Sequence, residues 1–540
     1  NDNDVEIVEK SENFKARVPY NGLTTNAIVW SDTSLLKKGE VNNSVLKIKI
    51  KGNGRYPQDL SGQTGTNVYV TYYLDKTTNI KDTYKNIKYD NTNALSVDFF
   101  FKYPYQMDRR GIPVVKASGL KVPDNLDSLD FCYGKISKDI YIDGDFIIDI
   151  NQSYCNANFY FGPNAKIIVQ KNKKLKLSSC ILTACAGRWQ GIYLEAGAAL
   201  ETDDNTAIHH AITAIEGDRA KVTLKKTDFE ENLTAVKLTN STVLPSEDIH
   251  IKDGTYGMML TLCGSIYLEN ADIRNVKSRG IKAENTFLIL TNCKITGTSK
   301  SASGYGIEST GTGHVLSITG ESEVSNWQVG INCLRNTMII NDAKFENNFI
   351  GITQTNSQGF SHTFFNNTFS NCDYGFTTTN STPIFTSYIE ENTFNNVKYG
   401  ISISNSTNHL AGWGIGKCNF TNSGAAGIRL RSASGNNISG CNMQSTGLPN
   451  STLISASGGS INKIFNNYLT CGSGMTPEAI QVKGIEIKGV TGISVSCNDT
   501  EGGTYAYNYS GMSPGHFAGN ISRNTHIGLY CGLYPSDGNA

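Results

Sequence analysis

The sequence predicts an all-β protein: a right-handed parallel β-helix, or solenoid, with a smaller N-terminal β domain. Three observations predict it, namely a short irregular repeat, runs that alternate between apolar and polar residues, and columns of Asn and Gly at regular places in the repeat. In a solenoid each coil contacts only its neighbours, so the loops can vary in length while the strands stay in register. The irregularity of the repeat therefore fits this fold.

The repeat runs from about Phe229 to Leu469 of the 540 residues. Each copy has an apolar residue, Asn two places on, then a small residue and an aliphatic one, as in Phe345-Glu-Asn347-Asn-Phe-Ile-Gly351-Ile352. A period of 21 to 29 residues suits stacked coils. The leading apolar position is occupied by Phe229, Ile251, Ile273, Ile295, Val324, Phe345, Phe369, Phe394, Phe420, Met443 and Leu469.

Alternating runs such as 400–404, 427–431 and 484–488 follow the small residue. A period of two points one side chain inward and the next outward, as in a strand. Leucine-rich repeats have similar lengths, but residues such as Asn, Thr, Ser and Gly disfavour their helical return segment. A second interior column is therefore expected at Val236, Met258, Ile281, Ile307, Ile331, Ile352, Phe376, Ile401 and Ile428.

Two further columns mark the bends. Asn tolerates left-handed backbone and can bond locally, so a stack of Asn predicts a turn ladder rather than a sugar- or metal-binding row. Gly is expected where a side chain would crowd the backbone. The Asn column comprises Asn275, Asn326, Asn347, Asn371, Asn396 and Asn422, and the Gly column comprises Gly257, Gly280, Gly306, Gly330, Gly351, Gly375, Gly400 and Gly427.

The first 125 residues lack the repeat but contain alternating runs at 45–51, 68–74 and 95–101. Such spacing predicts a β-sandwich-like domain over residues 1–125, or alternatively an irregular cap on the open end of the solenoid. The β-helix is assigned to residues 126–540. We expect the start at Asn1 to be a mature or trimmed one, with a further linker or sorting module after Ala540.

Composition narrows the function. Lys plus Arg equals Asp plus Glu at 48 each, which argues against a nucleic-acid partner. No apolar run approaches the length of a transmembrane segment. The thirteen cysteines form no CxxC pairs, so no metal or other cofactor is expected. Cys293, Cys418 and Cys441 should face the interior, and the last two, on adjacent coils, are expected to be buried thiols rather than a disulfide.

The run Trp189-Gln-Gly-Ile-Tyr193 and the recurring Asn-Asn-x-x-Gly-Ile and Asn-x-Phe-x-Asn patterns resemble a known family. They are similar to secreted right-handed parallel β-helix proteins of the pectate-lyase-like superfamily, with PbH1-type repeats. Multi-domain surface proteins of Bacteroidota-type bacteria are the nearest resemblance, which covers roughly residues 130 to 530. It implies a secreted or cell-surface location. It does not imply one activity, because this fold carries many.

Catalytic signatures of that superfamily are absent. The polygalacturonase patterns Asn-Thr-Asp and Gly-His-Gly do not occur, nor do Trp-x-Asp-His and Asp-Pro-His-Glu. Asp203-Asp204 does not follow a Gly, and the match at Arg219-Ala-Lys221 stands alone. His209-His210 is the tightest titratable cluster near these acids, but neighbours in a strand should face opposite sides. No catalytic residue is therefore assigned.

Outward positions after the Gly column suggest a binding face instead. Hydroxyl side chains over three coils, followed by two arginines, would stack as Thr353, Thr355, Thr377, Thr379, Ser402, Ser404, Arg429 and Arg431. Such a face could contact a polysaccharide or cell-surface glycan, with nearby aromatics at Tyr374, Tyr399 and Trp413. The plain alternative is a soluble sheet face, since outward Thr is common in strands.

The sequence thus predicts a non-catalytic extracellular or cell-surface β-helix protein, an adhesin or structural stalk with possible glycan binding. Two alternatives remain. One is a polysaccharide lyase or glycoside hydrolase with an unrecognised site. The other is a phage tailspike or fibre, which would predict trimerisation.

Overall fold

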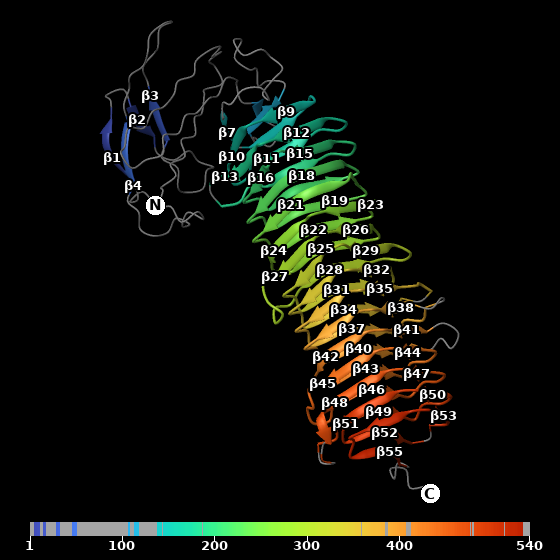
Figure 1. The fold of residues 1–540 in the computed structure, drawn as a ribbon. Helices are drawn as coiled ribbons and strands as arrows, with labels where there is room; N and C mark the ends of the chain where they lie inside the picture. The colour runs from blue at the N-terminus through green and yellow to red at the C-terminus, as the bar shows by residue number, and fades with distance from the viewer. Residues whose placement is uncertain are drawn as a thin grey trace. The chain divides into compact units, whose positions relative to one another are not determined.

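The computed structural model describes residues 138–532, apart from 143, 186, 358, 384–386, 407–411, 476, 478–479 and 512. It also describes six short N-terminal stretches, 5–10, 14–17, 29–32, 46–50, 106–107 and 113–117. Within these residues the chain consists of strands and turns without an α-helix. The fold is a right-handed parallel β-helix of about 16 turns, which confirms the predicted class (Figure 1). No helix in the described part has the length and apolarity that crossing a membrane requires.

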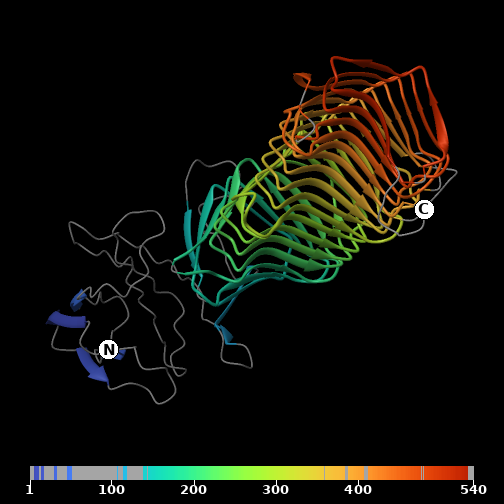
Figure 2. The same cartoon turned by 90° about the horizontal axis from the view of Figure 1, so that it is seen from below.

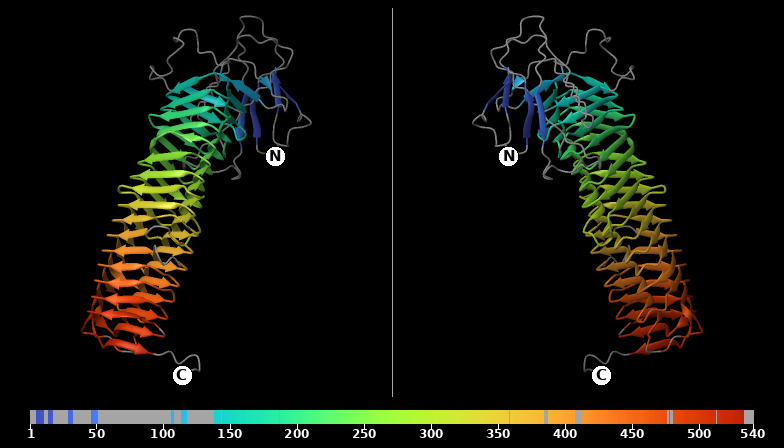
Figure 3. Two further views of the ribbon diagram at one scale, coloured as in Figure 1. Left: turned by 90° about the vertical axis from the view of Figure 1, so that its right-hand side faces the viewer. Right: turned by 90° about the vertical axis from the view of Figure 1, so that its left-hand side faces the viewer.

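Each complete coil contributes a strand to each of three parallel sheets, seen as stacked rungs in Figures 2 and 3. Sheet 1 follows the Gly column and comprises β6 (Pro113–Lys116), β8 (Asp145–Ile148), β11 (Lys166–Val169), β14 (Gly191–Leu194), β17 (Thr213–Asp218), β19 (Thr234–Thr239), β22 (Tyr256–Thr261), β25 (Arg279–Glu284), β28 (Tyr305–Thr310), β31 (Val329–Leu334), β34 (Ile350–Thr355), β37 (Tyr374–Thr379), β40 (Tyr399–Ser404), β43 (Ala426–Arg431), β46 (Thr452–Ser457), β49 (Lys483–Lys488), β52 (Tyr505–Ser510) and β55 (Ile527–Gly532).

Sheet 2 carries the leading apolar residues and comprises β7 (Lys138–Ile142), β10 (Ala157–Phe161), β13 (Ile181–Ala184), β16 (Thr206–His209), the second half of β18 (Lys221–Glu230), β21 (Ser246–Lys252), β24 (Asp272–Val276), β27 (Lys294–Gly297), β30 (Glu323–Ser325), β33 (Lys344–Glu346), β36 (Thr368–Ser370), β39 (Thr393–Asn395), β42 (Asn419–Ser423), β45 (Asn442–Ser445), β48 (Tyr468–Met475), β51 (Asp499–Gly503) and β54 (Ile521–Arg523).

Sheet 3 precedes sheet 2 in each coil and comprises β9 (Gln152–Cys155), β12 (Lys174–Ser178), β15 (Ala199–Asp203), the first half of β18, β20 (Thr242–Val243), β23 (Ser265–Glu269), β26 (Phe287–Thr291), β29 (Val315–Thr319), β32 (Thr337–Asn341), β35 (Thr363–Phe365), β38 (Ser387–Glu390), β41 (Trp413–Gly416), β44 (Asn437–Ser439), β47 (Lys463–Phe465), β50 (Ile493–Ser496) and β53 (Gly515–Ala518). Strand β18 runs through the corner and pairs in both sheets 2 and 3.

The N-terminal part shows short antiparallel pairs. Strand β1 (Val5–Lys10) pairs with β4 (Leu46–Ile50), β2 (Phe14–Arg17) pairs with β3 (Val29–Asp32), and β5 (Gln106–Met107) pairs with β6. One compact unit comprises residues 1–72 and 89–96, and a second comprises 73–88 and 97–540. The predicted runs 68–74 and 95–101 lie outside the described residues, so the sandwich and its boundary at residue 125 stay predictions.

Both interior columns are confirmed by the register. In sheet 2 the leading apolar residues pair in an unbroken series, with Phe345 opposite Phe369 and Phe369 opposite Phe394. Their rings stack with centroids 4.8 Å apart at both steps. In sheet 1 Ile352 pairs with Phe376 and Phe376 with Ile401. These side chains are 0–1% exposed, so they form one continuous core along the solenoid.

The Asn column forms the predicted turn ladder. All six members have left-handed backbone, with φ from 52° to 61°. Their amides also link coils, since Asn347 Nδ2 donates to Asn326 Oδ1 at 2.5 Å and Asn396 Nδ2 donates to Asn371 Oδ1 at 2.8 Å. Four of the six side-chain amides thus bond within the column, and Asn275 Nδ2 donates to Asp253 Oδ1 at 3.1 Å.

The Gly column has a different cause. At Gly375 a Cβ would lie 2.6 Å from the carbonyl oxygen of Gly400 and 2.7 Å from the Phe394 ring. The backbone there is not left-handed, so the requirement is space alone. The entry into sheet 1 brings successive coils so close that only hydrogen fits.

Gly375→Ala should therefore lower the free energy of unfolding by about 1–3 kcal/mol, the usual range for overpacking a core. Gly264→Ala is the matched control, because nothing lies within 4 Å of a Cβ at that position. We expect it to change stability by less than about 0.5 kcal/mol. Chemical denaturation of both variants measures the difference, and equal stabilities would contradict the crowding at Gly375.

Most of the described cysteines are free thiols buried in the core. Cys293, Cys418 and Cys441 are free thiols and are buried, as predicted. Burial raises the pKa of Cys293 to about 11, which keeps the thiol protonated and unreactive. Cys155, at the end of β9, differs because it is disulfide-bonded.

Candidate functional site

The outer face of sheet 1 carries the predicted binding residues. Along β34, β37 and β43 the fourth and sixth positions point outward, because the third and fifth are buried. The register places Thr353, Thr377, Ser402 and Arg429 in one row, and Thr355, Thr379, Ser404 and Arg431 in a second. We call these eight residues the hydroxyl–arginine face. The structure therefore brings all eight together over four consecutive coils.

This face lies in a stretch with few charges. Between Asn347 and Ile428 the only charged residues of the sequence are Asp373, Glu390, Glu391, Lys398 and Lys417. None occupies an outward position of β34, β37 or β40. The hydroxyls on β34, β37 and β40 therefore have no charged side chain beside them at the outward positions of these three strands.

A third outward row runs beside them and is aromatic. The rings of Tyr374 and Tyr399 stack with centroids 4.8 Å apart and 14° between their planes. Phe349, 39% exposed, meets Tyr374 edge-on at 5.7 Å. Because these contacts occupy ring faces, the stack offers mainly ring edges and phenol groups to the solvent. Neighbouring hydroxyls and aromatic edges suit the mixed polar and apolar surface of a sugar.

Arg429 closes the stack at its C-terminal end. Its guanidinium carbon lies 4.5 Å from the centroid of the Tyr399 ring. Its Nε and Nη2 donate to Ser402 Oγ at 3.2 and 3.1 Å. Ser402 is consequently only 4% exposed. The expectation of a flat hydroxyl face is therefore wrong at Ser402, whose hydroxyl is bonded to and covered by the arginine of the next coil.

Trp413 does not belong to this site, contrary to expectation. It is fully buried, because it starts β41 at an inward position of sheet 3. Its ring stacks on His362 with centroids 5.6 Å apart. Its large apolar surface fills the core beside His362 and Phe364, which belong to the coil two turns earlier.

A loop lies beside the aromatic row. Lys300, in the turn after β27, forms an ion pair with Asp373 at 3.3 Å, although 73 residues separate them. Asp373 directly precedes Tyr374 in the corner that leads into β37. The loop therefore reaches across the intervening coils to the edge of the hydroxyl–arginine face and neutralises the acid there.

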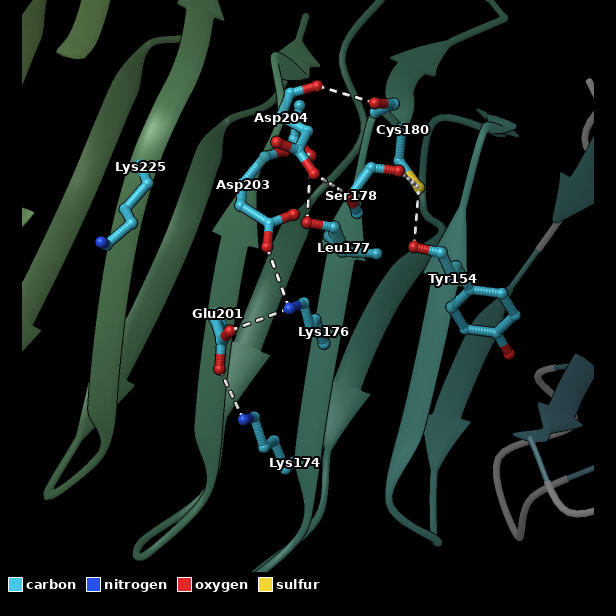
Figure 4. A network of polar contacts seen from close by, with 12 residues as sticks. Tyr154, Lys174, Lys176, Leu177, Ser178, Cys180, Glu201, Asp203, Asp204 and Lys225 are labelled. Atoms are coloured by element: carbon cyan, nitrogen blue, oxygen red, sulfur yellow. Dashed lines mark hydrogen bonds and ion pairs between the residues drawn. The ribbon is translucent and has the colours of Figure 1, made fainter. Parts of the chain in front are cut away.

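The acids near residue 203 form a separate polar network on sheet 3 (Figure 4). Lys174 and Lys176 pair with Glu201 at 2.5 and 3.1 Å, and Lys176 also pairs with Asp203 at 2.9 Å. These contacts lower the pKa of Glu201, chiefly through Lys174, and raise the pKa of Lys176, chiefly through Asp203. Fully charged, mutually neutralised groups of this kind suit cross-strand pairing rather than proton transfer.

His209 and His210 are not joined to that network. Asp204 lies in the turn before β16 and accepts a hydrogen bond from Ser178 Oγ at 2.8 Å. His209 ends β16, so about 13 Å of extended strand separates it from the acids. His210 pairs with Glu231 at 3.3 Å. Asp204 and His209 are close in the sequence, but they lie at opposite ends of β16.

The two histidines also depart from the expected opposite faces. His210 has left-handed backbone, with φ of 57°, so it belongs to the turn and not to the strand. Both side chains are half-buried, and their rings lie 6.0 Å apart. Burial lowers the pKa of His209. The alternation rule failed here because it applies only within a continuous strand.

The contact between Arg429 and Tyr399 was not predicted from the sequence. A signal was present, since Tyr immediately precedes Gly in two consecutive copies, at Tyr374 and Tyr399. In-register repeats place such tyrosines one above another. Which residue of the following coil covers the last ring could not be read from spacing alone.

Two family models match parts of the chain. A right handed beta helix region matches residues 165–350, and the periplasmic copper-binding protein NosD matches residues 269–476. No curated protein matches the chain. Together with the strand pairings, the first match identifies a right-handed parallel β-helix protein.

Several solved structures resemble the chain in fold. The mannuronan C-5 epimerase A-module of Azotobacter vinelandii is 12% identical over 70% of this chain and 89% of its own, with a TM-score of 0.26. A tailspike mutant of E. coli bacteriophage HK620, in complex with a pentasaccharide, is 8% identical over 72% and 74%, with a TM-score of 0.32. An α-1,3-glucanase of Streptomyces thermodiastaticus is 9% identical over 74% and 65%, with a TM-score of 0.27. Values this low have no bearing on the activity of this chain.

Proposed function

We propose that this chain is a non-catalytic β-helix protein that binds a glycan on its hydroxyl–arginine face, as an adhesin or structural stalk. One observation carries the proposal: two rows of hydroxyls on β34, β37 and β40, each followed by an arginine, lie in register beside the stacked Tyr374 and Tyr399. Sugar hydroxyls both donate and accept, so they match Thr and Ser side chains and the phenol hydroxyls of the tyrosines beside them.

The carboxylates of sheet 1 support a non-catalytic role. Glu308 pairs with Arg279 at 2.5 Å, and Glu284 pairs with Lys282 at 3.1 Å. A glycosidase needs one carboxyl held protonated and a second free to act as base or nucleophile. Carboxylates fixed by cations serve neither role well.

We further propose a location outside the cytoplasm, on the surface of a Bacteroidota-type bacterium or secreted from it. The disulfide at Cys155 supports an oxidising compartment. The resemblance carried by Trp189-Gln-Gly-Ile-Tyr193 supports the bacterial source.

Binding should depend on the hydroxyls of Thr353 and Thr377. We expect the double change Thr353→Ala and Thr377→Ala to weaken binding of the strongest glycan on an array about tenfold, because two hydrogen bonds worth roughly 0.5–1.5 kcal/mol each are lost. Thr368→Ala with Thr393→Ala is the matched control. These two residues are also half-buried and paired on adjacent coils, but they lie on sheet 2.

Titration of each variant with that glycan measures the effect. If both double variants weaken binding equally, the glycan does not bind specifically on sheet 1. If the wild type binds no glycan, the proposed function is wrong. The same samples should be assayed for reducing sugars and unsaturated products. Turnover of any polysaccharide would instead establish the lyase or hydrolase alternative.

A further inference from the structure

Two arginines of sheet 1 stack on tyrosines, and the first shows how the protein completes such an arrangement. Arg279 lies 5.4 Å from the ring centroid of Tyr305, one coil further on. Its Nε donates to a carboxylate oxygen of Glu308 at 2.5 Å, from the same neighbouring strand. The tyrosine fixes one face of the guanidinium, and the glutamate neutralises its charge.

Arg429 has the tyrosine but lacks the carboxylate. It lies closer to its ring, 4.5 Å from the centroid of Tyr399. Where Arg279 meets Glu308, Arg429 meets the neutral hydroxyl of Ser402. Among the described residues, no carboxylate forms an ion pair with Arg429 or with Arg431 beside it.

The surroundings of Arg429 are positive. Lys398 lies 5.8 Å from the same Tyr399 ring, and Arg431 follows two residues later on the same face. Asp373, the acid of the adjacent corner, is already paired with Lys300. Burial and the charge of Arg431 lower the pKa of Arg429, although a guanidinium stays protonated at any ordinary pH.

This arrangement suits an anion supplied from outside. A half-buried guanidinium has lost part of its hydration. The hydrogen bonds to Ser402 replace some of the lost water contacts but supply no opposite charge. Its planar fork is also held in place by Tyr399 and Ser402, so little freedom remains to be lost on binding. A guanidinium edge matches the two oxygens of a carboxylate, and a sulfate offers the same pair.

We propose that Arg429, with Arg431 beside it, is the anchoring site for an anionic group of the bound glycan, a carboxylate or a sulfate ester. The ligand supplies the negative charge that Glu308 supplies at Arg279. The inference rests on the proposed glycan function and narrows its ligand to acidic saccharides. The neutral sugar units before the anionic one then lie along the hydroxyl rows of β34, β37 and β40.

The test uses pairs of probes that differ in charge alone. One pair is an oligogalacturonate and its methyl ester, and the other is a sulfated galactan oligomer and its desulfated form. We expect the wild type to bind at least one charged probe about tenfold or more tightly than its neutral partner, and less tightly as salt is raised. The preferred pair shows which of the two anions is recognised.

Three variants locate the site. Arg429→Gln should abolish the preference for the charged probe, so that this probe binds no more tightly than its neutral partner does. Arg429→Lys keeps the charge but loses the fork, so an intermediate loss is expected. Lys463→Gln, which removes a cation from the exposed face of sheet 3, should change nothing. Circular dichroism and thermal unfolding of each variant check that it is folded.

The outcomes separate the two proposals. If neutral probes bind as tightly as charged ones and Arg429→Gln weakens neither, the anion site is wrong and the glycan face stands. If charged probes are preferred but Lys463→Gln weakens them as much as Arg429→Gln, the preference is a diffuse effect of charge and the anion site is wrong. If neither these probes nor any glycan on the array binds, both proposals fall.

Discussion

Phe369→Ala is expected to lower the free energy of unfolding by about 3–5 kcal/mol, the range for removing a buried aromatic ring. Phe369 stacks on Phe345 and on Phe394, with centroids 4.8 Å away on each side. Its ring also fills the space beside Gly351, where a Cβ would lie 2.8 Å from it. One substitution therefore opens contacts with two neighbouring coils.

Phe365→Ala is the control. Phe365 lies in β35, only four residues earlier, but its ring is 40% exposed on the outside of sheet 3. We expect it to cost less than about 1 kcal/mol. Because solenoid stability is the sum of local interfaces, hydrogen exchange in the coils on either side of residue 369 is the sharpest measurement. Similar losses for both variants would contradict the internal ring stack.

Acid should destabilise the coils around His362. The ring is buried between Trp413 and Phe364, and burial lowers the pKa of His362 to about 3. Its Nδ1 accepts a hydrogen bond from the backbone N–H of Met338 at 3.2 Å. An unfolded histidine titrates near 6.5. Between pH 3 and pH 6.5, roughly, His362 is protonated in the unfolded state but neutral in the folded state.

Stability therefore falls as pH decreases from about 6.5 towards about 3, and His362 contributes no slope above that window. The total is on the order of 5 kcal/mol. His362→Gln should lower stability at neutral pH but flatten the slope within the window. The exposed His250→Gln should leave the slope as in the wild type. Thermal unfolding of the three proteins at several pH values measures this, and a wild-type slope in His362→Gln would refute the buried neutral imidazole.

Much of the fold could be predicted from the sequence, because equivalent positions in successive repeats show which residues pair between neighbouring coils. Once Phe345, Phe369 and Phe394 occupy equivalent places, in-register stacking follows from the requirement that each coil bury its apolar residues on the next. The Asn turns were predictable for a similar reason. Asn adopts left-handed backbone more readily than most residues, and the ladder stabilises it.

The site was predicted in outline only. Spacing placed Thr353, Thr377 and Arg429 in one row. It could not place Trp413, since inward and outward positions exchange wherever a loop shifts the phase of the alternation. Nor could it show that Arg429 would cover the hydroxyl of Ser402, because a long side chain reaches into the neighbouring coil in a direction that backbone spacing does not define.

The sequence by itself thus determined the coil, its interior columns and the row of outward hydroxyls, since these depend on period and polarity. Only the tertiary structure decided which charges are neutralised. Arg279 forms an ion pair with Glu308, whereas Arg429 has no carboxylate partner among the described residues. Ion pairs across coils depend on distances of a few ångströms between side chains more than twenty residues apart, and loop lengths set those distances.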